Sequence, residues 1–479
     1  MTGNADLNIA SIEYDSRRIT SDALFVAISG EKFDGYDFAK QAVANGAVAL
    51  LGERDVCPAA AAHVTVSNAR QAMADIAARF YGYPAAKLNL FGVTGTNGKT
   101  TTCFLIRDIL EAAGHFTGLV TSSVYDTGSE IIHALRTTPE SLDLQRLLFQ
   151  ISKNSCDSAV IEVSSHSLIM HRVDNVLFKT VLFTNLTRDH LDFHNSMEEY
   201  LKAKAQLLNH LTDNDATAVI NIDVPEFVSL MNSDDINFVT YSLSNPEADI
   251  YCSSYRIEPS STKFDLMTPT GMRHVKLNIP GRFNLINAVA AAAACHSGGI
   301  ADEDIVNGLE HAVPVPGRLN YIDQGQPFAL YVDFAHTPDA LERACEAVKE
   351  LSAGRLLLLF GCGGDRDKGK RPLMGEVAGR LADFVCVTSD NPRSEDPHAI
   401  IEDIKPGLSG AEVKIEPDRK KAIGTVLKKA QAGDVVLLAG KGAEKYQEIE
   451  DEFIPFDEID IARQALNELG YDQTSEVEN

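Results

Sequence analysis

Basic residues are scarce in this chain compared with acidic ones. Its 479 residues include 43 lysines and arginines against 68 aspartates and glutamates, which gives a formal net charge of −25. Nucleic acids and anionic membrane surfaces both bind basic protein faces, so we expect no nucleic acid and no membrane as a partner. An anionic substrate would have to be held by arginines and lysines placed locally at its binding site.

Long apolar runs and closely spaced cysteines are also absent. No apolar run approaches the roughly 20 residues that cross a bilayer, and residues 1–8 are polar, unlike the apolar segment of a signal peptide. The eight cysteines are scattered without close pairs, which argues against a zinc site and against a disulfide framework. We therefore expect a protein of the reducing cytoplasm.

A glycine-rich loop is the most informative feature that the sequence does contain. It lies between an apolar stretch and a helical pattern and reads Gly95-Thr96-Asn97-Gly98-Lys99-Thr100-Thr101. Backbone N–H groups and the helix N-terminus would meet phosphate oxygens, Lys99 would neutralise charge, and the Thr100 hydroxyl could hold Mg²⁺. A glycine-rich turn that binds nothing is the alternative. The Lys-Thr-Thr run at a helix start favours a nucleoside triphosphate, although Val93 replaces the first glycine of the usual eight-residue pattern.

Strand-like and helical patterns alternate along the chain, which is too long for one core. This alternation is typical of doubly wound parallel sheets and predicts three α/β domains, at residues 1–88, 89–315 and 316–479. The polar segment 243–280 suggests a small β-rich insert, and the alanine-rich run 288–295 suggests a buried helix. The strand-like runs are 24–30, 46–52, 90–94, 159–163, 180–184, 217–221, 328–333, 355–360, 383–388 and 434–439.

Acidic and histidine residues follow two of these predicted strands. Glu162 ends an apolar strand, and the carboxyl end of a parallel strand is the rim where ligands bind, so this carboxylate could hold Mg²⁺. A solvated glutamate at a strand end is the alternative. His190 lies in a cluster of histidines and aspartates after the next strand. Without cysteines nearby, such a cluster favours an oxygen-rich Mg²⁺ rim over a zinc site.

Lys204 falls on an apolar helical stripe. Helical spacing places it with Tyr200 and Leu207, whereas Lys202 falls on the polar face. An inward lysine is costly unless it is paired or unless its pKa falls, which makes the amine chemically useful. An ammonium that reaches solvent at the edge of the helix is the alternative, and the pattern alone does not decide between the two.

Four polar loops follow predicted strands in the last third of the chain. Such loops at several strand ends describe an open α/β site, although any one of them alone could be an ordinary turn. The loops are Asp333-Phe334-Ala335-His336, Gly361 to Lys370, Asp390-Asn391-Pro392-Arg393 and Gly440 to Glu444.

Taken in order, these motifs resemble those of the Mur ligases, which join amino acids to the UDP-muramoyl precursor of peptidoglycan. Two motifs depart from the family pattern, because Ala443 stands where histidine is common and Leu319-Asn320 replaces Met-Glu. Further matching motifs are Asp15-Ser16-Arg17, Thr137-Thr138-Pro139, Glu162 to His166, Asp189 to Asp192, Ala203-Lys204, Gly281 to Asn287 and Pro316-Gly317-Arg318.

The resemblance implies an α/β fold of three domains. Residues 1–88 would form an N-terminal α/β UDP-binding domain, 89–315 a central P-loop doubly wound ATPase domain, and 316–479 a C-terminal Rossmann-like α/β domain. ATP would phosphorylate the γ-carboxylate of D-glutamate in UDP-N-acetylmuramoyl-L-Ala-D-Glu. The amine of meso-diaminopimelate would then attack the acyl phosphate. The protein is expected to act as a monomer.

The resemblance also implies roles for single residues. The catalytic residues would be Lys99, Glu162, His190 and Lys204. Lys204 would be carbamylated by CO₂ and would hold Mg²⁺ together with Thr100, Glu162 and His190. ATP would contact Gly95, Thr96, Asn97, Gly98, Lys99, Thr100, Thr101, Asn287, Arg318 and His336. The UDP-muramoyl dipeptide would contact Ser16, Thr137, Thr138, Ser164 and Arg172. Diaminopimelate would contact Arg366, Asp390, Asn391, Pro392, Arg393, Gly440 and Glu444.

Arg393 carries the prediction for diaminopimelate. This amino acid differs from lysine by one distal carboxylate, which an arginine binds best through two hydrogen bonds. Arg366 would assist with a carboxylate and Glu444 with the distal ammonium. An Arg393 that only braces its loop through Asp390 or Asp396 is the alternative. The competing functions are a lysine-adding Mur ligase, a folylpolyglutamate synthase-like ligase and a non-enzymatic P-loop switch.

Overall fold

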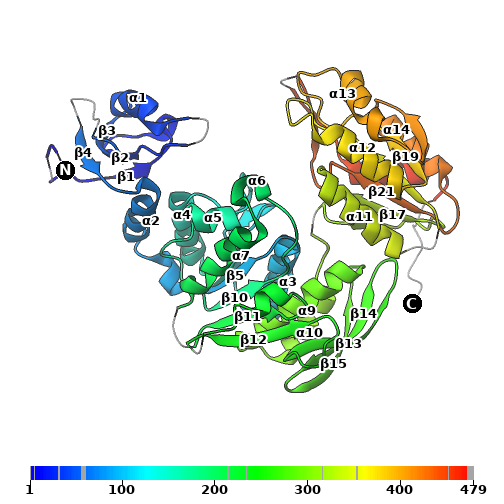
Figure 1. Cartoon of the computed structure of the whole chain (residues 1–479), viewed down its shortest axis with the longest axis horizontal. Helices are drawn as coiled ribbons and strands as arrows, with labels where there is room; N and C mark the ends of the chain where they lie inside the picture. The colour runs from blue at the N-terminus through cyan, green and yellow to red at the C-terminus, as the bar shows by residue number, and fades with distance from the viewer. Residues whose placement is uncertain are drawn as a thin grey trace. The chain divides into compact units, whose positions relative to one another are not determined.

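The computed structural model describes two compact units, which we treat separately (Figure 1). The first consists of residues 1–253, 265–273 and 286–309, and the second of residues 254–264, 274–285 and 310–479. Within these ranges, the described residues are 2–4, 6–30, 33–55, 61–212, 215–233, 235–315, 317–351, 354–450 and 452–471.

The first unit begins with a four-stranded parallel sheet in the order β1-β2-β3-β4. The predicted strands 24–30 and 46–52 correspond to β2 and β3, and β2 ends earlier than expected, at Val26. Asn68 caps α2 by accepting hydrogen bonds from two backbone N–H groups of the first helical turn. The elements are β1 Ser11–Glu13, β2 Ala23–Val26, α1 Ala39–Ala44, β3 Ala47–Gly52, β4 Ala62–Thr65 and α2 Ala69–Phe80.

An eleven-stranded sheet follows, in the order β15-β14-β13-β12-β11-β10-β5-β9-β6-β7-β8. Its parallel core runs from β12 to β6. The strands are β5 Asn89–Thr94, β6 Thr117–Val120, β7 Val124–Asp126, β8 Ile131–His133, β9 Ser158–Glu162, β10 Thr180–Phe183, β11 Thr217–Asn221, β12 Asn237–Ser242, β13 Ile250–Ile257, β14 Thr262–Thr268 and β15 Gly271–Leu277. The helices are α3 Lys99–Ala112, α4 Ser141–Lys153, α5 Ser165–Ile169, α6 Leu191–His194, α7 Met197–Ala205, α8 Pro225–Val228, α9 Arg282–Ser297 and α10 Asp302–His311.

The predicted β-rich insert at 243–280 is confirmed, because the segment holds β13, β14 and β15. Its first strand, β13, pairs in parallel with β12, so the segment extends the edge of the central sheet. The predicted buried helix 288–295 is confirmed within α9, where these residues are at most 1% exposed.

The C-terminal sheet has six strands in the order β16-β17-β21-β18-β19-β20. Five are parallel, and β16 pairs antiparallel with β17. The four strands predicted here are confirmed as β17, β18, β19 and β21. The elements are β16 Asn320–Ile322, β17 Ala329–Asp333, α11 Pro338–Glu350, β18 Leu356–Phe360, α12 Lys370–Leu381, β19 Phe384–Val387, α13 Pro397–Ile404, β20 Glu412–Ile415, α14 Arg419–Lys429, β21 Val435–Ala439, β22 Tyr446–Ile449, β23 Glu452–Pro455 and α15 Glu458–Glu468.

The seven cysteines in the described part of the chain are all buried and free, whereas Cys57 lies outside the described residues. Among the described residues, no helix combines the length and apolar character that a bilayer crossing requires.

Close helix packing under the central sheet depends on one glycine. A Cβ at Gly308 in α10 would lie 2.4 Å from the Ile109 Cα of α3, a distance that real Cβ atoms do not reach. We expect Gly308→Ala to lower the free energy of unfolding by about 1–3 kcal/mol because backbone must move to relieve the overlap. Denaturant unfolding of purified protein would measure this.

Gly424→Ala is the matched control, because Gly424 also lies inside a helix but has open space around its Cα. This variant should be neutral or slightly stabilising, since alanine restricts the unfolded chain. Equal unfolding free energies for the two variants would contradict the packing argument.

Candidate active site

The phosphate-type loop lies between β5 and α3 and is fastened to the loop that follows β10. Thr96 N–H donates to the Asn185 carbonyl at 2.8 Å, and Asn97 N–H donates to the Asn185 side chain at 2.9 Å. The Thr184 hydroxyl donates to the Asn97 carbonyl at 2.6 Å. Since β5 and β10 are parallel neighbours, their carboxyl ends place both loops at one sheet edge.

Two glycines of this loop have conformations that other residues rarely adopt. Gly95 has φ 145° and Gly98 has φ 79°. A Cβ at Gly95 would lie 1.9 Å from the Thr184 hydroxyl oxygen, and one at Gly98 would lie 2.3 Å from the Asn287 amide oxygen. Asn287, predicted as an ATP contact, thus lies directly against the loop.

Lys99 begins α3 and folds back over its own loop. Its ammonium donates to the carbonyls of Gly95 at 3.2 Å and Thr96 at 2.9 Å, and it lies 4.0 Å from a Glu162 oxygen. The side chain is 15% exposed. A cation held this way, beside the N-terminus of α3, suits a phosphate group.

Glu162 and Thr100 form a buried oxygen cluster at the end of β9. The Thr100 hydroxyl donates to Glu162 Oε2 at 2.8 Å, and Ser122 N–H donates to the same oxygen at 2.9 Å. The described residues contain no group of three or more His, Cys, Asp or Glu side chains that could hold a metal. Mg²⁺ is usually bound through one or two carboxylates with waters and phosphate oxygens, so this sparse oxygen set fits Mg²⁺. Ser122 was not identified from the sequence.

Lys204 points inward, as its helical phase predicts. Its side chain is 1% exposed, whereas Lys202 is 71% exposed and pairs with Glu198. The Lys204 amine donates to the Gly95 carbonyl at 2.7 Å and lies 4.2 Å from the centre of the Tyr200 ring. Burial, and then the nearby Lys99 charge, hold the pKa of the Lys204 amine well below its usual range. The alternative of an ammonium that reaches solvent is therefore excluded.

His190 lies at the start of α6 in a left-handed conformation, with φ 54°. Its ring lies edge-on to His166, with ring centres 4.9 Å apart, and its side chain is 47% exposed. His194, from the same histidine and aspartate cluster, is buried and hydrogen-bonds Ser165 at 2.8 Å. The histidine cluster is thus divided into one accessible ring and one structural ring.

Three of the predicted substrate contacts gather beside Glu162. The Thr138 hydroxyl donates to the Glu162 carbonyl at 2.8 Å, and Ser164 N–H donates to that hydroxyl at 3.1 Å. Arg172 donates to the Thr138 carbonyl at 3.2 Å and pairs with Glu140 at 2.9 Å.

Thr137 adjoins this group in the chain, whereas Ser16 lies in the four-stranded sheet region. The Ser16 hydroxyl donates to Gln41 at 3.3 Å. No contact joins Ser16 to the Thr138 group among the described residues, so the structure does not bring this predicted contact to the others.

The second unit holds the remaining predicted contacts at the carboxyl edge of its sheet. Arg318 lies 5.9 Å from the centre of the Phe334 ring. The His336 ring contacts the Phe334 carbonyl at 3.0 Å, and desolvation by the surrounding protein lowers the pKa of His336 although part of the residue is exposed. Burial also raises the pKa of Asp333, which accepts hydrogen bonds from the backbone of Leu319 and Ala335. Pro316 lies outside the described residues.

The loops that follow β19 and β21 meet through a polar network. Asn391 donates to Glu444 at 3.0 Å, and the buried Lys441 donates to Asn391, to Glu444 at 3.1 Å and to the Tyr446 carbonyl at 2.9 Å. Asp390 lies 3.5 Å from the Lys441 ammonium. Lys441 lies in the predicted Gly440–Glu444 loop, although no sequence pattern distinguishes it from its neighbours there.

Arg393 is paired, but not with the partners considered from the sequence. Its Nε lies 2.7 Å from Glu448, and its Nη1 donates to the Gly364 carbonyl at 2.8 Å. Its backbone is left-handed, with φ 52°, a strained conformation of the kind found at functional sites. Arg366 is exposed and donates to the Asp365 carbonyl.

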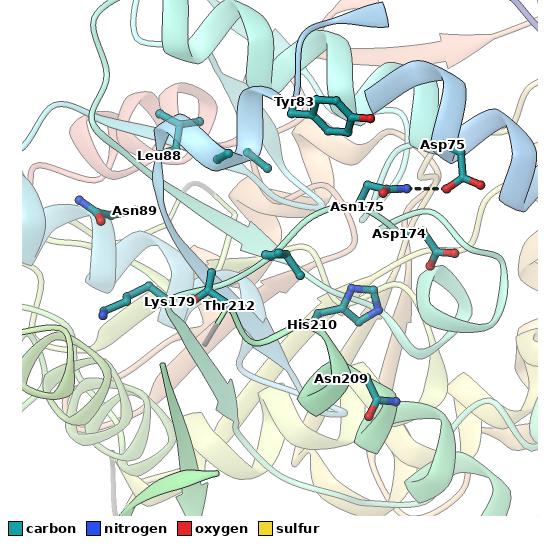
Figure 2. Close-up of a pocket in the computed structure, with 13 residues that line it drawn as sticks. Asp75, Tyr83, Leu88, Asn89, Asp174, Asn175, Lys179, Asn209, His210 and Thr212 are labelled. Carbon is teal, nitrogen blue, oxygen red and sulfur yellow. Dashed lines mark hydrogen bonds between the residues drawn. The ribbon is translucent and has the colours of Figure 1, made fainter. Parts of the chain in front are cut away.

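A pocket of about 750 Å³ lies at the opposite edge of the central sheet (Figure 2). Asn89 and Lys179 border it, at or just before the starts of β5 and β10, and Asp75 and Asn175, which are hydrogen-bonded at 2.8 Å, border another side. Ligands of open parallel sheets bind outside the carboxyl ends of the strands. This pocket is therefore separate from the loops described above.

Comparison with protein families gives three matches along the chain. Residues 8–81 match the Mur ligase family catalytic domain, 93–295 the Mur ligase middle domain, and 317–442 the Mur ligase glutamate ligase domain.

Individual relatives agree with these matches. A UDP-N-acetylmuramoyl-L-alanyl-D-glutamate–2,6-diaminopimelate ligase of Caldanaerobacter subterraneus subsp. tengcongensis is 43% identical, covering 97% of this chain and 96% of the relative. The Geobacillus kaustophilus ligase of the same name is 44% identical over 98% of this chain and 96% of its own length.

Solved structures give the same fold. A structure of a ligase with this name has a TM-score of 0.69 at 33% identity, covering 96% of this chain and 95% of that chain. A Mycobacterium tuberculosis folylpolyglutamate synthase has a TM-score of 0.63 at 17% identity, covering 77% of this chain and 91% of that chain, and shows the fold alone. With relatives above 40% identity along nearly its whole length, this chain belongs to the Mur ligase family.

Proposed function

We propose that this protein is an ATP-dependent ligase of cytoplasmic peptidoglycan precursor synthesis. It adds meso-diaminopimelate to the γ-carboxylate of D-glutamate in UDP-N-acetylmuramoyl-L-Ala-D-Glu, through an acyl phosphate. The observation that carries the proposal is the convergence of Lys99, Lys204 and Glu162 on the carboxyl edge of the central sheet. The names of the relatives support the choice of substrates.

The central sheet supplies the residues for the first chemical step. The loop Gly95–Thr101 would hold the ATP phosphates, with Lys99 neutralising charge as the γ-phosphoryl group moves to the carboxylate. Asn287 would border the same nucleotide, and Arg318 and His336 would contact it from the C-terminal region. Thr137, Thr138, Ser164 and Arg172 would hold the muramoyl peptide, and Ser16 would lie near the UDP end. Positioning is the main catalytic contribution of these contacts.

Thr100, Glu162, His190 and Lys204 are the residues that would hold Mg²⁺. When bound, the metal would neutralise the charge of the phosphate oxygens. Lys204 needs an acid group to act as a ligand, and its buried, deprotonation-prone amine is suited to carbamylation by CO₂. The modification converts an amine, which is a poor ligand for Mg²⁺, into a carboxylate, which Mg²⁺ prefers.

Selection of diaminopimelate would depend on the loops after β19 and β21. Arg393 would bind the distal carboxylate, assisted by Arg366, and Glu444 would accept from the distal ammonium. Asp390, Asn391, Pro392 and Gly440 would shape the same pocket. Lysine lacks the distal carboxylate, so it would leave the Arg393 charge without its ligand, which is the physical basis of discrimination.

Substrate-dependent ATP turnover tests the proposal as a whole. With UDP-N-acetylmuramoyl-L-Ala-D-Glu present, phosphate release should require an amino acid, and meso-diaminopimelate should give a higher kcat/KM than L-lysine. Phosphate release and the ligated product would be measured across a panel of amino acids. Turnover with folate and glutamate, or turnover without an amino acid, would contradict the proposal.

Lys204→Ala should nearly abolish ligation because the modified side chain would be lost. Acetate should restore part of the rate by replacing the missing carboxylate, and bicarbonate should not. Lys202→Ala, on the exposed face of the same helix, is the matched control and should keep near wild-type rates. Near-normal ligation by Lys204→Ala at low Mg²⁺ would refute the metal-binding role.

Arg393→Ala should lower kcat/KM for diaminopimelate by about thirtyfold or more, because a charge-assisted contact is lost at a partly buried site. The KM for ATP should barely change, and the low rate with lysine should be little affected. Arg380→Ala, which removes an exposed arginine paired with Glu342, is the control. A variant that keeps its discrimination between the two amino acids would remove Arg393 from the specificity pocket.

A further inference from the structure

Lys441 is a fully buried cation for which the proposed reaction has no direct use. Its side chain has no exposed surface, and it lies between Gly440 and Gly442, which have φ of 115° and 54°. A Cβ at Gly442 would lie 2.7 Å from Phe334 Cβ, so the turn after β21 is closely packed. This left-handed turn carries the lysine side chain into the protein.

The Lys441 ammonium is saturated by protein groups. It donates to the Asn391 side-chain oxygen, to Glu444 Oε2 at 3.1 Å and to the Tyr446 carbonyl at 2.9 Å. Asp390 Oδ1 lies 3.5 Å away as a second carboxylate. An ammonium has three donors, so a buried Lys441 with three acceptors does not touch a ligand. Burying this charge is costly unless the partners are in place.

These contacts leave one edge of Glu444 available. Its Oε2 accepts from both Lys441 and Asn391, at 3.1 and 3.0 Å. Among the described residues, no hydrogen bond or ion pair is made to Oε1, and the side chain is 22% exposed. Lys441 therefore fixes the carboxylate by one oxygen and leaves the other for a ligand ammonium.

The same lysine is linked to Arg393 through Asn391. Asn391 Oδ1 accepts from Lys441 and from Glu448 N–H, the latter at 2.9 Å. Glu448 in turn accepts from Arg393 N–H through its backbone carbonyl at 3.1 Å and pairs with Arg393 Nε through its carboxylate at 2.7 Å. One buried cation thus orders the β22 strand, which holds the Arg393 guanidinium in place.

We infer that Lys441 is a positioning residue for the amino-acid substrate. It sets the geometry of Glu444 and Arg393. At the distal centre of a zwitterionic amino acid, Glu444 would bind the ammonium and Arg393 would bind the carboxylate. The inference rests on the proposed function, but it concerns a residue that no ligand would contact.

Lys441→Met, compared with Lys441→Arg, tests this role in the full-length enzyme. Methionine keeps the length of the side chain and removes the cation, so KM for diaminopimelate should rise about thirtyfold or more. The KM values for ATP and for UDP-N-acetylmuramoyl-L-Ala-D-Glu should change less than about twofold. The arginine variant should recover part of the loss because it restores the charge. Lys445→Met is the matched control, since Lys445 lies in the same turn but is exposed.

A double-variant cycle separates positioning from general stability. If Lys441 acts through Glu444, then adding Lys441→Met to Glu444→Gln should raise KM for diaminopimelate far less than Lys441→Met does in the wild type. Additive effects, or an unchanged KM for diaminopimelate in Lys441→Met, would overturn the inference. If Lys441→Met does not fold, as judged by circular dichroism, Lys441→Gln carries the same cycle.

The wild-type assay keeps this inference distinct from the proposed function. Wild-type enzyme without diaminopimelate-dependent turnover would refute the proposed function. An active wild type together with a Lys441→Met variant of unchanged KM would refute the positioning role alone.

Discussion

Two lysines, Lys99 and Lys204, donate hydrogen bonds to the Gly95 carbonyl. The arrangement of the central site depends on this shared acceptor. Lys99 reaches it from the start of α3, and Lys204 reaches it from α7, at 3.2 and 2.7 Å. The carbonyl can face both lysines because the backbone at Gly95 adopts φ 145° and passes against Thr184 without a side chain. Two cations this close disfavour each other's charge, which is part of the reason why the pKa of Lys204 falls. In the C-terminal sheet, a buried ion pair orders the loops of the proposed amino-acid pocket.

Arg419 and Glu458 are both fully buried and lie 2.7 Å apart. The guanidinium also donates to the Ala439 carbonyl at 2.8 Å and to the Ser389 carbonyl at 3.3 Å. These carbonyls immediately precede Gly440 and Asp390, so the ion pair fastens the two loops that form the proposed amino-acid pocket. Such a pair is weak evidence for stability, because desolvation offsets much of the attraction. Its value here is geometric, since it fixes where both loops begin.

The sequence predicted the parallel strands well because buried strands are continuous apolar runs. β5, β9, β10 and β11 were found this way, and so was the phase of Lys204, which follows from helical spacing alone. The strands β6, β12, β16 and β20 were missed. Polar residues or glycine interrupt the apolar pattern of these strands, and β20 is mostly exposed, so they carry little apolar signal. The place of β13 beside β12 is a tertiary pairing that no local pattern encodes.

Site prediction from the sequence had a similar limit. Motifs identified residues that chemistry requires, such as Lys99, Glu162 and Arg393, but not the residues that orient them. Ser122, Lys441 and Glu448 act through contacts made in three dimensions; Ser122 and Glu448 lie outside the strongest motifs. Glu448 shows why this matters, because Arg393 was considered free for substrate or braced by a neighbour in sequence. It is instead held by a strand more than fifty residues away, and its Nε is already occupied.

That occupancy constrains how Arg393 could bind a carboxylate. Glu448 pairs with Nε, and the Gly364 carbonyl accepts one hydrogen bond from Nη1. A guanidinium has five N–H donors in a rigid fork, so the end formed by Nη1 and Nη2 is the remaining edge for a two-pronged contact. The Glu448 charge also offsets that of Arg393 when no ligand is bound, which lowers the cost of keeping an arginine partly buried. A ligand carboxylate would then add to an already oriented cation, whereas a lysine side chain has no carboxylate to offer and would leave this edge unfilled.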